Sequence, residues 1–331
     1  MKVVTCIGYH GTGSGAVADY LKEFKTINDP CNLKGEFEFR LLYDPDGIRD
    51  LEYHLVSERL RGNSSAAIKR FIKYAKILDK DYSKRFNIDF YKISQDYISS
   101  IAKFSYYGWS LPDFYTFSSF KRKKIYFKKL MVYLFNRKKW KDRSNINPYK
   151  KELSYHSNIS KNDFDLATKE YLNHIFENSF DDNKINLLEQ MTPTNNISEY
   201  IEYFDDLKVF VVDRDPRDCY IQYMLKHEHI YSTNVDEFCE MYKDYRDISS
   251  KENNNICKID FEDMIYNYES TTKKIREFIG ISENEKINTR IFKPEVSKKN
   301  TKLFLKHPEF SSDIKIIEEK LSDYLYEFPL E

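Results

Sequence analysis

The chain has 331 residues, which is enough for a substantial hydrophobic core and for one large α/β domain with an insertion or two smaller domains. Its 53 Lys and Arg residues balance its 53 Asp and Glu residues, so no overall charge indicates nucleic acid as a partner. No apolar stretch is as long as a membrane-spanning helix, and the first expected strand begins almost directly after Met1. We therefore expect a cytoplasmic protein without a signal peptide or an N-terminal anchor.

The N-terminal segment predicts a strand, a glycine-rich loop and a helix in succession. A β-branched run ends at Gly8, and apolar residues then recur at helical spacing as Val17, Leu21 and Phe24. Such a loop directs several backbone N–H groups, and the positive end of a helix dipole, at one point where a phosphate can bind. The loop residues are Gly8, Tyr9, His10, Gly11, Thr12, Gly13, Ser14 and Gly15.

This loop departs from the nucleoside-triphosphate version of the motif. Gly8 and Gly13 have the Walker spacing, but Ser14 and Gly15 follow where that motif has lysine and then the serine or threonine that binds magnesium. The phosphate lysine and the magnesium hydroxyl are both missing. The sequence therefore predicts a phosphate-bearing ligand whose reaction requires no metal.

Residues 34–40, with the sequence Lys-Gly-Glu-Phe-Glu-Phe-Arg, alternate between polar and apolar side chains, which is typical of a strand. The alternation places Glu36 and Glu38 on one face.

Residues 50–180 contain few glycines or prolines and many aromatic and charged residues at helical spacing, so we expect a helical insertion between the first and later strands. A basic stretch, residues 121–143, lies within it, with apolar residues interleaved. Three interpretations stay open: a solvated helix face, a site for an anionic glycan, or a peripheral contact with an acidic membrane surface.

A second buried strand, residues 208–212, is followed by Asp213-Arg214-Asp215-Pro216-Arg217-Asp218. Pro216 is suited to begin a helix. The Arg214 guanidinium would lie at the carboxyl end of its strand, beside the glycine loop if the two strands are neighbours, where open α/β sheets bind ligands. For Arg217 and Asp218 we expect salt bridges within the protein.

These motifs resemble those of sulfotransferases that use 3′-phosphoadenosine 5′-phosphosulfate (PAPS). The glycine loop looks like the 5′-phosphosulfate loop of that family, and residues 214–218 look like its 3′-phosphate motif. Residues 188–193 resemble its acid-x-x-x-Pro stretch, and residues 259–280 resemble its late strand and helix. The resemblance covers residues 1–40 and 185–305.

The resemblance implies a donor site and an acceptor site. The loop from Gly8 to Gly15 would bind the 5′-phosphosulfate, and Arg214 the 3′-phosphate. In the family a late basic loop often folds over the 3′-phosphate, and Ser297, Lys298 and Lys299 match it, although a mobile basic loop without a ligand is an alternative. An early glutamate, here Glu36 or Glu38, would be the base. The acceptor pocket would be built largely from the helical insertion.

Two residues depart from the family pattern. The family commonly has a lysine in the first loop, and here only His10 and the hydroxyls of Thr12 and Ser14 are offered. A serine usually follows the motif arginine by eight positions, where this chain has Gln222.

The sequence thus predicts an α/β fold with a central parallel sheet of the P-loop type, flanked by helices, in a single domain over residues 1–331. We expect sulfuryl transfer from PAPS, leaving adenosine 3′,5′-bisphosphate, to a hydroxyl of a carbohydrate or glycan, without a metal. A P-loop kinase and a non-catalytic protein that binds a nucleotide or an anionic glycan remain as alternatives.

Overall fold

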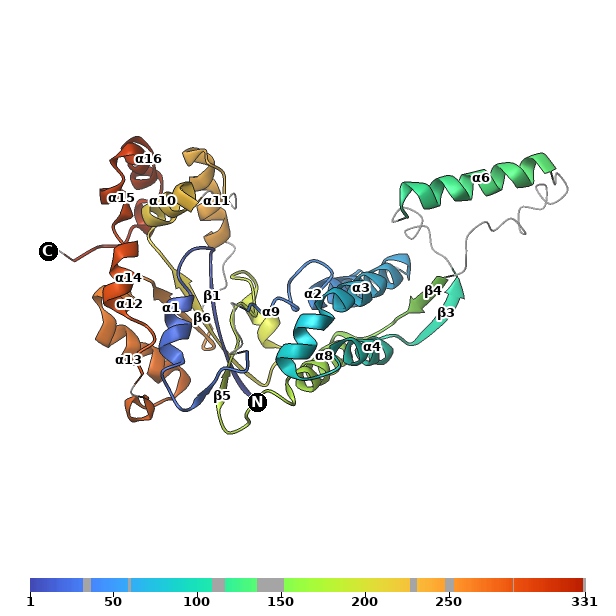
Figure 1. The fold of residues 1–331 in the computed structure, drawn as a ribbon, viewed down its shortest axis with the longest axis horizontal. Helices are drawn as coiled ribbons and strands as arrows, with labels where there is room; N and C mark the ends of the chain where they lie inside the picture. Colours follow the sequence, from blue (N-terminus) through green and yellow to red (C-terminus); the bar gives the residue numbers. More distant parts are fainter. Residues whose placement is uncertain are drawn as a thin grey trace. The chain divides into compact units, whose positions relative to one another are not determined.

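The structure is a computed structural model, which describes residues 1–31, 37–58, 61–108, 117–135, 152–226, 231–247, 253–287 and 289–329. The chain divides into two compact units (Figure 1). The first unit joins residues 1–43 to residues 176–331, and the second consists of residues 44–175. The second unit is close in extent to the expected helical insertion.

The first unit is built on a five-stranded sheet in the order β2-β5-β1-β6-β7, in which every pairing is parallel. Its strands are β1 (Lys2–Gly8), β2 (Ile27–Asn28), β5 (Ile185–Leu187), β6 (Asp206–Asp213) and β7 (Ile256–Asp260). The predicted fold class, a central parallel sheet flanked by helices, is confirmed.

The central pair of strands, β1 and β6, fixes the position of the site. Both strands are apolar on both faces, as is typical of the buried middle of a parallel sheet. They pair from Lys2 with Asp206 to Gly8 with Val212, so both end at the same edge. The glycine loop and the turn that begins at Asp213 therefore leave the sheet side by side, as the sequence predicts.

Helices cover this sheet and extend beyond its carboxyl edge. They are α1 (Gly15–Leu21), α9 (Ile197–Ile201), α10 (Pro216–Lys226), α11 (Val235–Asp247), α12 (Asp263–Tyr266), α13 (Tyr268–Ile279), α14 (Pro294–Ser297), α15 (Leu303–Lys306) and α16 (Ser311–Lys320). Short 3₁₀ turns follow at Glu283–Glu285, Lys298–Asn300, Pro308–Phe310 and Ser322–Tyr324. As expected, α10 begins at Pro216, and Gly280 ends α13 in the left-handed conformation.

Two hydrophobic cores hold these layers. One face of β1 and β6 packs with α1 and α13, where Val4, Val17, Phe210 and Ile275 are all buried. A second core joins α10, α11 and α16 through aromatic and aliphatic side chains such as Phe238. Together they fix α1 and α10, which follow the two predicted ligand-binding segments, relative to the sheet.

The second unit is mainly helical. Its elements are α2 (Ile48–Glu52), a π-helical turn (Tyr53–Ser57), α3 (Arg61–Phe86), α4 (Phe90–Ile101), β3 (Phe104–Gly108), α6 (Ser119–Phe135), β4 (Glu152–His156) and α8 (Lys161–Phe176). β3 and β4 form an antiparallel pair. Buried aromatic rings join three of the helices: Tyr97 of α4 stacks on Tyr171 of α8 at 4.4 Å between centroids, and Phe71 of α3 lies against both.

The strand expected over residues 34–40 is not formed where the structure describes it. Residues 37–40 belong to no strand, and Lys34, Gly35 and Glu36 lie outside the described residues. The backbone N–H of Phe39 donates one hydrogen bond to the Glu189 carbonyl (2.9 Å), without a continuing ladder. The alternation instead reflects burial, because Phe39 is buried while Glu38 and Arg40 are exposed.

Candidate functional site

The glycine loop makes a tight turn between β1 and α1. The Thr12 hydroxyl accepts a hydrogen bond from the backbone N–H of Tyr9 (3.1 Å) and donates one to the carbonyl of Val212 on β6 (2.7 Å). A Cβ at Gly8 would stand 2.2 Å from the Thr12 hydroxyl oxygen, so this position requires glycine. The turn is thus fixed to both central strands.

Left-handed backbone gives the loop its shape. His10, Gly11 and Gly13 have φ angles of 55°, 65° and 86°. Histidine tolerates this region better than most residues. Gly13 has no alternative, since a Cβ there would lie 2.5 Å from the Phe261 ring. Left-handed residues in turns of this kind help to direct backbone N–H groups toward a concave anion site.

Side chains of the protein bind three backbone carbonyl groups of the loop. The Tyr231 hydroxyl donates to the Tyr9 carbonyl (3.1 Å), and the Tyr223 hydroxyl donates to the His10 carbonyl (2.7 Å). The Arg214 guanidinium donates to the Gly11 carbonyl (2.9 Å). Meanwhile the backbone N–H groups of residues 10–15 donate to no group within the described residues. Six consecutive donors are therefore left for a ligand.

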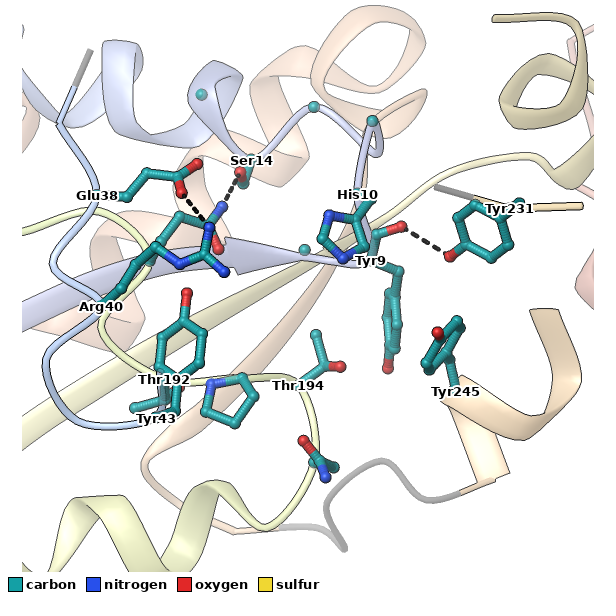
Figure 2. A pocket seen from close by; sticks show the side chains of 17 residues that line it. Tyr9, His10, Ser14, Glu38, Arg40, Tyr43, Thr192, Thr194, Tyr231 and Tyr245 are labelled. Atoms are coloured by element: carbon teal, nitrogen blue, oxygen red, sulfur yellow. Dashed lines mark hydrogen bonds and ion pairs between the residues drawn. The ribbon is translucent and has the colours of Figure 1, made fainter. Parts of the chain in front are cut away.

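A cavity of about 720 Å³ lies at the loop (Figure 2). All of its described lining residues belong to the first unit: Gly8, Tyr9, His10, Gly11, Gly13, Ser14, Gly15, Glu38, Arg40, Tyr43, Gln190, Thr192, Pro193, Thr194, Asn195, Tyr231 and Tyr245. This volume is within the range of small-molecule sites, about 300–1,000 Å³. The loop thus borders a space large enough for a ligand.

The acid-x-x-x-Pro stretch forms one wall of this cavity. Its Gln190, in the left-handed region with φ of 54°, donates from the side-chain amide to the Ser14 hydroxyl (3.1 Å). Glu189 instead forms an ion pair with Lys22 (2.9 Å). The Thr192 hydroxyl is buried without a hydrogen-bond partner among the described residues. The cavity wall therefore carries a polar group that a ligand would satisfy.

Glu38 lies at the cavity, whereas Glu36 lies outside the described residues. Its side chain is half exposed and stands 3.5 Å from the Arg40 guanidinium (Figure 2). Arg40 also approaches the Tyr43 ring, at 5.5 Å from its centroid. Among the described lining residues, Arg40 carries the one permanent positive charge. The cavity thus brings together a carboxylate, a guanidinium and the His10 imidazole.

Arg214 lies beside the loop, as the sequence predicts, and is buried at 4% exposure. One terminal nitrogen donates to the Gly11 carbonyl and to Gln222, and the other donates to the Asn300 carbonyl. The Nε–H is buried without a partner among the described residues. The Nε–H is therefore the guanidinium donor that remains for a phosphate oxygen.

The other charged residues of this turn are satisfied within the protein. Arg217 pairs with Asp215 (2.7 Å) and Glu318 (3.0 Å), and Asp213 pairs with Arg246. The Asp218 carboxylate accepts from the backbone N–H groups of Lys302 (2.8 Å) and Leu303 (2.7 Å). The expected salt bridge of Arg217 is confirmed. Asp218 is instead bonded to backbone amides.

Burial shifts the pKa of two carboxyl groups here. It raises the pKa of Asp218 to about 6, with the Arg214 charge acting in the opposite direction. It raises the pKa of Glu262 to about 8, although one oxygen accepts from the Asp215 backbone N–H (3.1 Å). The second Glu262 oxygen is buried without a partner among the described residues.

The late basic segment reaches this turn through its backbone. Ser297 ends α14, and Lys298 and Lys299 belong to the following 3₁₀ turn, whose last carbonyl, Asn300, accepts from Arg214. The Lys298 ammonium lies 5.7 Å from the centroid of the Tyr266 ring. The segment is thus adjacent to Arg214, while these contacts give Ser297 and Lys299 no ligand role.

Several residues of the site were not singled out from the sequence. Arg40 ends the alternating run, so its pairing with Glu38 across one intervening residue was a readable signal. Tyr223 directly follows Gln222, whose position the family pattern indicates. Tyr231 and Tyr245 carry no signal in the sequence, because the packing of α10 and α11 brings them to the glycine loop. Gln190 lies in the stretch 188–193 that the sequence indicates, although its bond to Ser14 depends on how the loop after β5 meets the glycine loop.

Comparison with protein-family models and with curated proteins finds no match. The solved structures that are similar to this chain include two sulfotransferase domains. One is the sulfotransferase domain from the Synechococcus PCC 7002 olefin synthase, with 11% identity and a TM-score of 0.40 over 99% of this chain and 96% of that one. The other is the sulfotransferase domain from the curacin biosynthetic pathway, with 9% identity and a TM-score of 0.36 over 88% and 77%. At these TM-scores and identities, function must be argued from the residues of the site.

Two further features concern the described part of the chain. No group of three or more His, Cys, Asp or Glu side chains is arranged to hold a metal ion there. None of the described helices combines the length and the apolar character needed to cross a bilayer.

Proposed function

We propose that this protein transfers a sulfuryl group from PAPS to a hydroxyl group of a carbohydrate or glycan. The observation that carries the proposal is the glycine loop, in which six consecutive N–H groups have no acceptor among the described residues while side chains bind three of its carbonyls. A loop with this arrangement binds an anion at a helix N-terminus. The sequence offers no lysine and no magnesium hydroxyl in this loop, which favours a phosphosulfate over a triphosphate.

The donor would be held at both of its phosphate groups. The 5′-phosphosulfate would bind the N–H groups of residues 10–15. The Arg214 Nε–H, which has no partner among the described residues, would bind the 3′-phosphate. Gln222 supports this by fixing the opposite side of the Arg214 guanidinium. Ser297, Lys298 and Lys299 remain candidates for further 3′-phosphate contacts because their segment touches Arg214.

Chemistry would take place in the adjoining cavity. The bound donor supplies an electrophilic sulfur and a phosphate leaving group. Glu38 would take the proton of the acceptor hydroxyl as its oxygen attacks sulfur, and the S–O bond to the phosphate breaks with its electron pair passing to that phosphate. Arg40 and His10 would stabilise the negative charge that develops, in place of the lysine missing from the loop. Glu36 stays an alternative base.

The cavity wall favours a sugar as acceptor. Four tyrosines line it: Tyr9, Tyr43, Tyr231 and Tyr245. Aromatic faces pack against the apolar faces of sugar rings and leave the hydroxyl groups of the sugar available. The buried Thr192 hydroxyl adds a hydrogen-bonding group without a protein partner among the described residues.

Calorimetric titration and thermal unfolding test the donor site. We expect adenosine 3′,5′-bisphosphate to bind without magnesium and to raise the melting temperature, because a ligand of the folded state stabilises it by mass action. ATP with magnesium should do much less. Equal stabilisation by magnesium ATP, with no gain from a 3′-phosphate, would instead indicate a kinase.

Turnover with radiolabelled PAPS and a panel of sugars and glycans tests the reaction. Glu38→Gln should reduce turnover by about 10²–10⁴-fold, the usual contribution of a general base, with donor affinity nearly unchanged. Arg40→Gln should reduce turnover more than it weakens acceptor binding. If Glu36→Gln is the variant that loses activity, the base is assigned to the wrong glutamate; if no acceptor is sulfated, the non-catalytic alternative holds.

A further inference from the structure

The outer face of α6 in the second unit is a stripe of exposed apolar side chains. Phe120, Phe127, Met131 and Leu134 are spaced at i, i+7, i+11 and i+14, which places them on one side of a helix. Their exposed fractions are 78%, 61%, 38% and 55%. By contrast, Ile125 points to the far side and is buried at 6%. The side of the helix that carries Ile125 is thus covered, and the side that carries the apolar stripe is exposed.

Positive charge borders this stripe. The 17 residues of α6 include six basic side chains and no acidic one. Lys123 and Lys124 are exposed, and helical geometry places them on opposite borders of the stripe. Lys121, at the start of the helix, forms an ion pair with Glu152 of β4 (2.6 Å). This contact ties α6 to the β3–β4 pair, while Lys123 and Lys124 are exposed.

We propose that α6 is an interfacial helix that binds the surface of an anionic lipid bilayer. Its apolar stripe would enter the boundary between headgroups and acyl chains, while the bordering lysines reach the lipid phosphates and carboxylates. Long lysine stems can lie along the apolar surface and still place their charges at the headgroups. A helix of 17 residues is about 25 Å long, and with six charges it lies along the surface rather than across it.

A bilayer fits this face better than a folded protein partner does. The charges are all of one sign, and Lys123 and Lys124 flank the four-residue apolar stripe, which matches an extended surface that is apolar beneath an anionic layer. Leu130 and Phe135 add exposed apolar surface beyond these two lysines. The proposal is independent of the donor site, because all of these residues belong to the second unit.

Co-sedimentation of the full chain with vesicles tests this proposal. We expect binding to phosphatidylcholine vesicles containing about 30% phosphatidylserine, and little binding to phosphatidylcholine alone. Binding should weaken as NaCl rises from about 0.05 M to about 0.5 M, because salt screens the attraction between the lysines and the headgroups. Equal binding to neutral and anionic vesicles, or no binding to either, would overturn the proposal.

Two double variants distinguish binding through this surface from non-specific hydrophobic binding. Phe127→Ser with Leu134→Ser should reduce vesicle binding by at least about tenfold, because both side chains would leave the bilayer. The matched control is Ile77→Ser with Leu166→Ser, which removes two side chains of similar exposure, 69% and 56%, from α3 and α8. Circular dichroism should show both double variants folded like the parent, and the control should bind as the parent does.

The charged border has its own control. Lys123→Glu with Lys124→Glu should abolish the preference for anionic vesicles, whereas Lys76→Glu with Lys80→Glu makes the same change in charge on exposed positions of α3. Equal losses in both pairs would show that only net charge matters and would contradict the proposal. If the parent binds no vesicles but forms a dimer that Phe127→Ser with Leu134→Ser dissociates, the stripe is an interface between two copies.

Discussion

The glycine loop and the turn at residues 213–218 leave neighbouring strands at the same edge of the sheet, yet they use their polar groups in opposite ways. In the loop, the carbonyls are bound by the protein and the N–H groups of residues 10–15 are left over. In the turn, Asp213, Asp215, Arg217 and Asp218 all have partners within the protein. The loop is arranged for a ligand, and most of the turn is arranged for stability.

Arg214 belongs to both arrangements. It donates to the Gly11 carbonyl and so orients the loop, and it keeps an unpartnered Nε–H at a buried position. The difference between the two regions shows that a run of charged residues after a strand does not by itself identify a ligand site. What distinguishes the two is whether donors remain after the protein's own acceptors have been counted.

The largest effect should come from Gly13. Gly13→Ala would place a Cβ within 2.5 Å of the Phe261 ring at a φ of 86°, so the loop must change shape. We expect the affinity for adenosine 3′,5′-bisphosphate to fall by at least about 100-fold, or roughly 3 kcal/mol, as measured by calorimetry.

Gly15 provides the matched control for this substitution. Nothing lies within 4 Å of a Cβ at Gly15, and its φ is not in the left-handed region. Gly15→Ala should therefore bind the nucleotide as the parent does. Similar losses for both variants would mean that the loop tolerates no substitution of any kind and that its left-handed geometry is not the cause.

Arg217 and Arg214 test the division of roles directly. Arg217→Ala leaves Asp215 buried without its cation, so the free energy of unfolding should fall by about 3 kcal/mol in urea denaturation, with nucleotide affinity unchanged. Arg214→Ala should weaken nucleotide binding by about 2 kcal/mol, since it removes charge-assisted hydrogen bonds and an anchor of the loop. If Arg217→Ala weakens binding as much as Arg214→Ala, the turn is a ligand site throughout.

The last effect is the smallest per step of the measurement, one pH unit, and concerns the stability of the turn. Burial raises the pKa of Glu262 to about 8, above its ordinary value of 4.5, so between these values the folded chain binds a proton that the unfolded chain lacks. This contribution to stability is complete below pH 4.5 and is lost as pH rises through 8. We expect the free energy of unfolding to fall by about 1 kcal/mol for each unit of rising pH in that window.

Glu262→Gln should remove this pH dependence, because the amide keeps the hydrogen bond from the Asp215 N–H and cannot ionise. Urea denaturation at several values between pH 5 and pH 8 would show a flatter profile than the parent and greater stability at the alkaline end. Parallel profiles for the two chains would show that Glu262 does not titrate in this window.

The sequence predicts the sheet and the loop well because both depend on short-range chemistry. A buried β-branched run, glycines at positions that tolerate no Cβ, and Pro216 at a helix start are local signals. The wrong prediction, a strand over residues 34–40, has a physical reason: alternation records which side chains are buried, and Phe39 is buried without a neighbouring strand to extend the sheet.

The cavity could not be predicted in the same way. Its lining comes from the loop, from residues 38–43, from the segment after β5 and from Tyr231 and Tyr245, which are far apart in the sequence. The roles of Tyr223 and Tyr231 follow from the carbonyls they reach, and only the packing of α10 and α11 brings them there. Which charges of residues 213–218 have internal partners likewise depends on residues as distant as Glu318.

The anchoring of the Tyr9, His10 and Gly11 carbonyls has a consequence for the thermodynamics and rate of association. A loop that must rearrange around its ligand loses conformational entropy at the moment of binding, and its encounter is slowed by the rearrangement. Here the two tyrosine hydroxyls and the guanidinium fix the loop when the chain folds, so that entropy is lost before any anion arrives. The amides that would bind the proposed phosphosulfate are therefore held in place before binding.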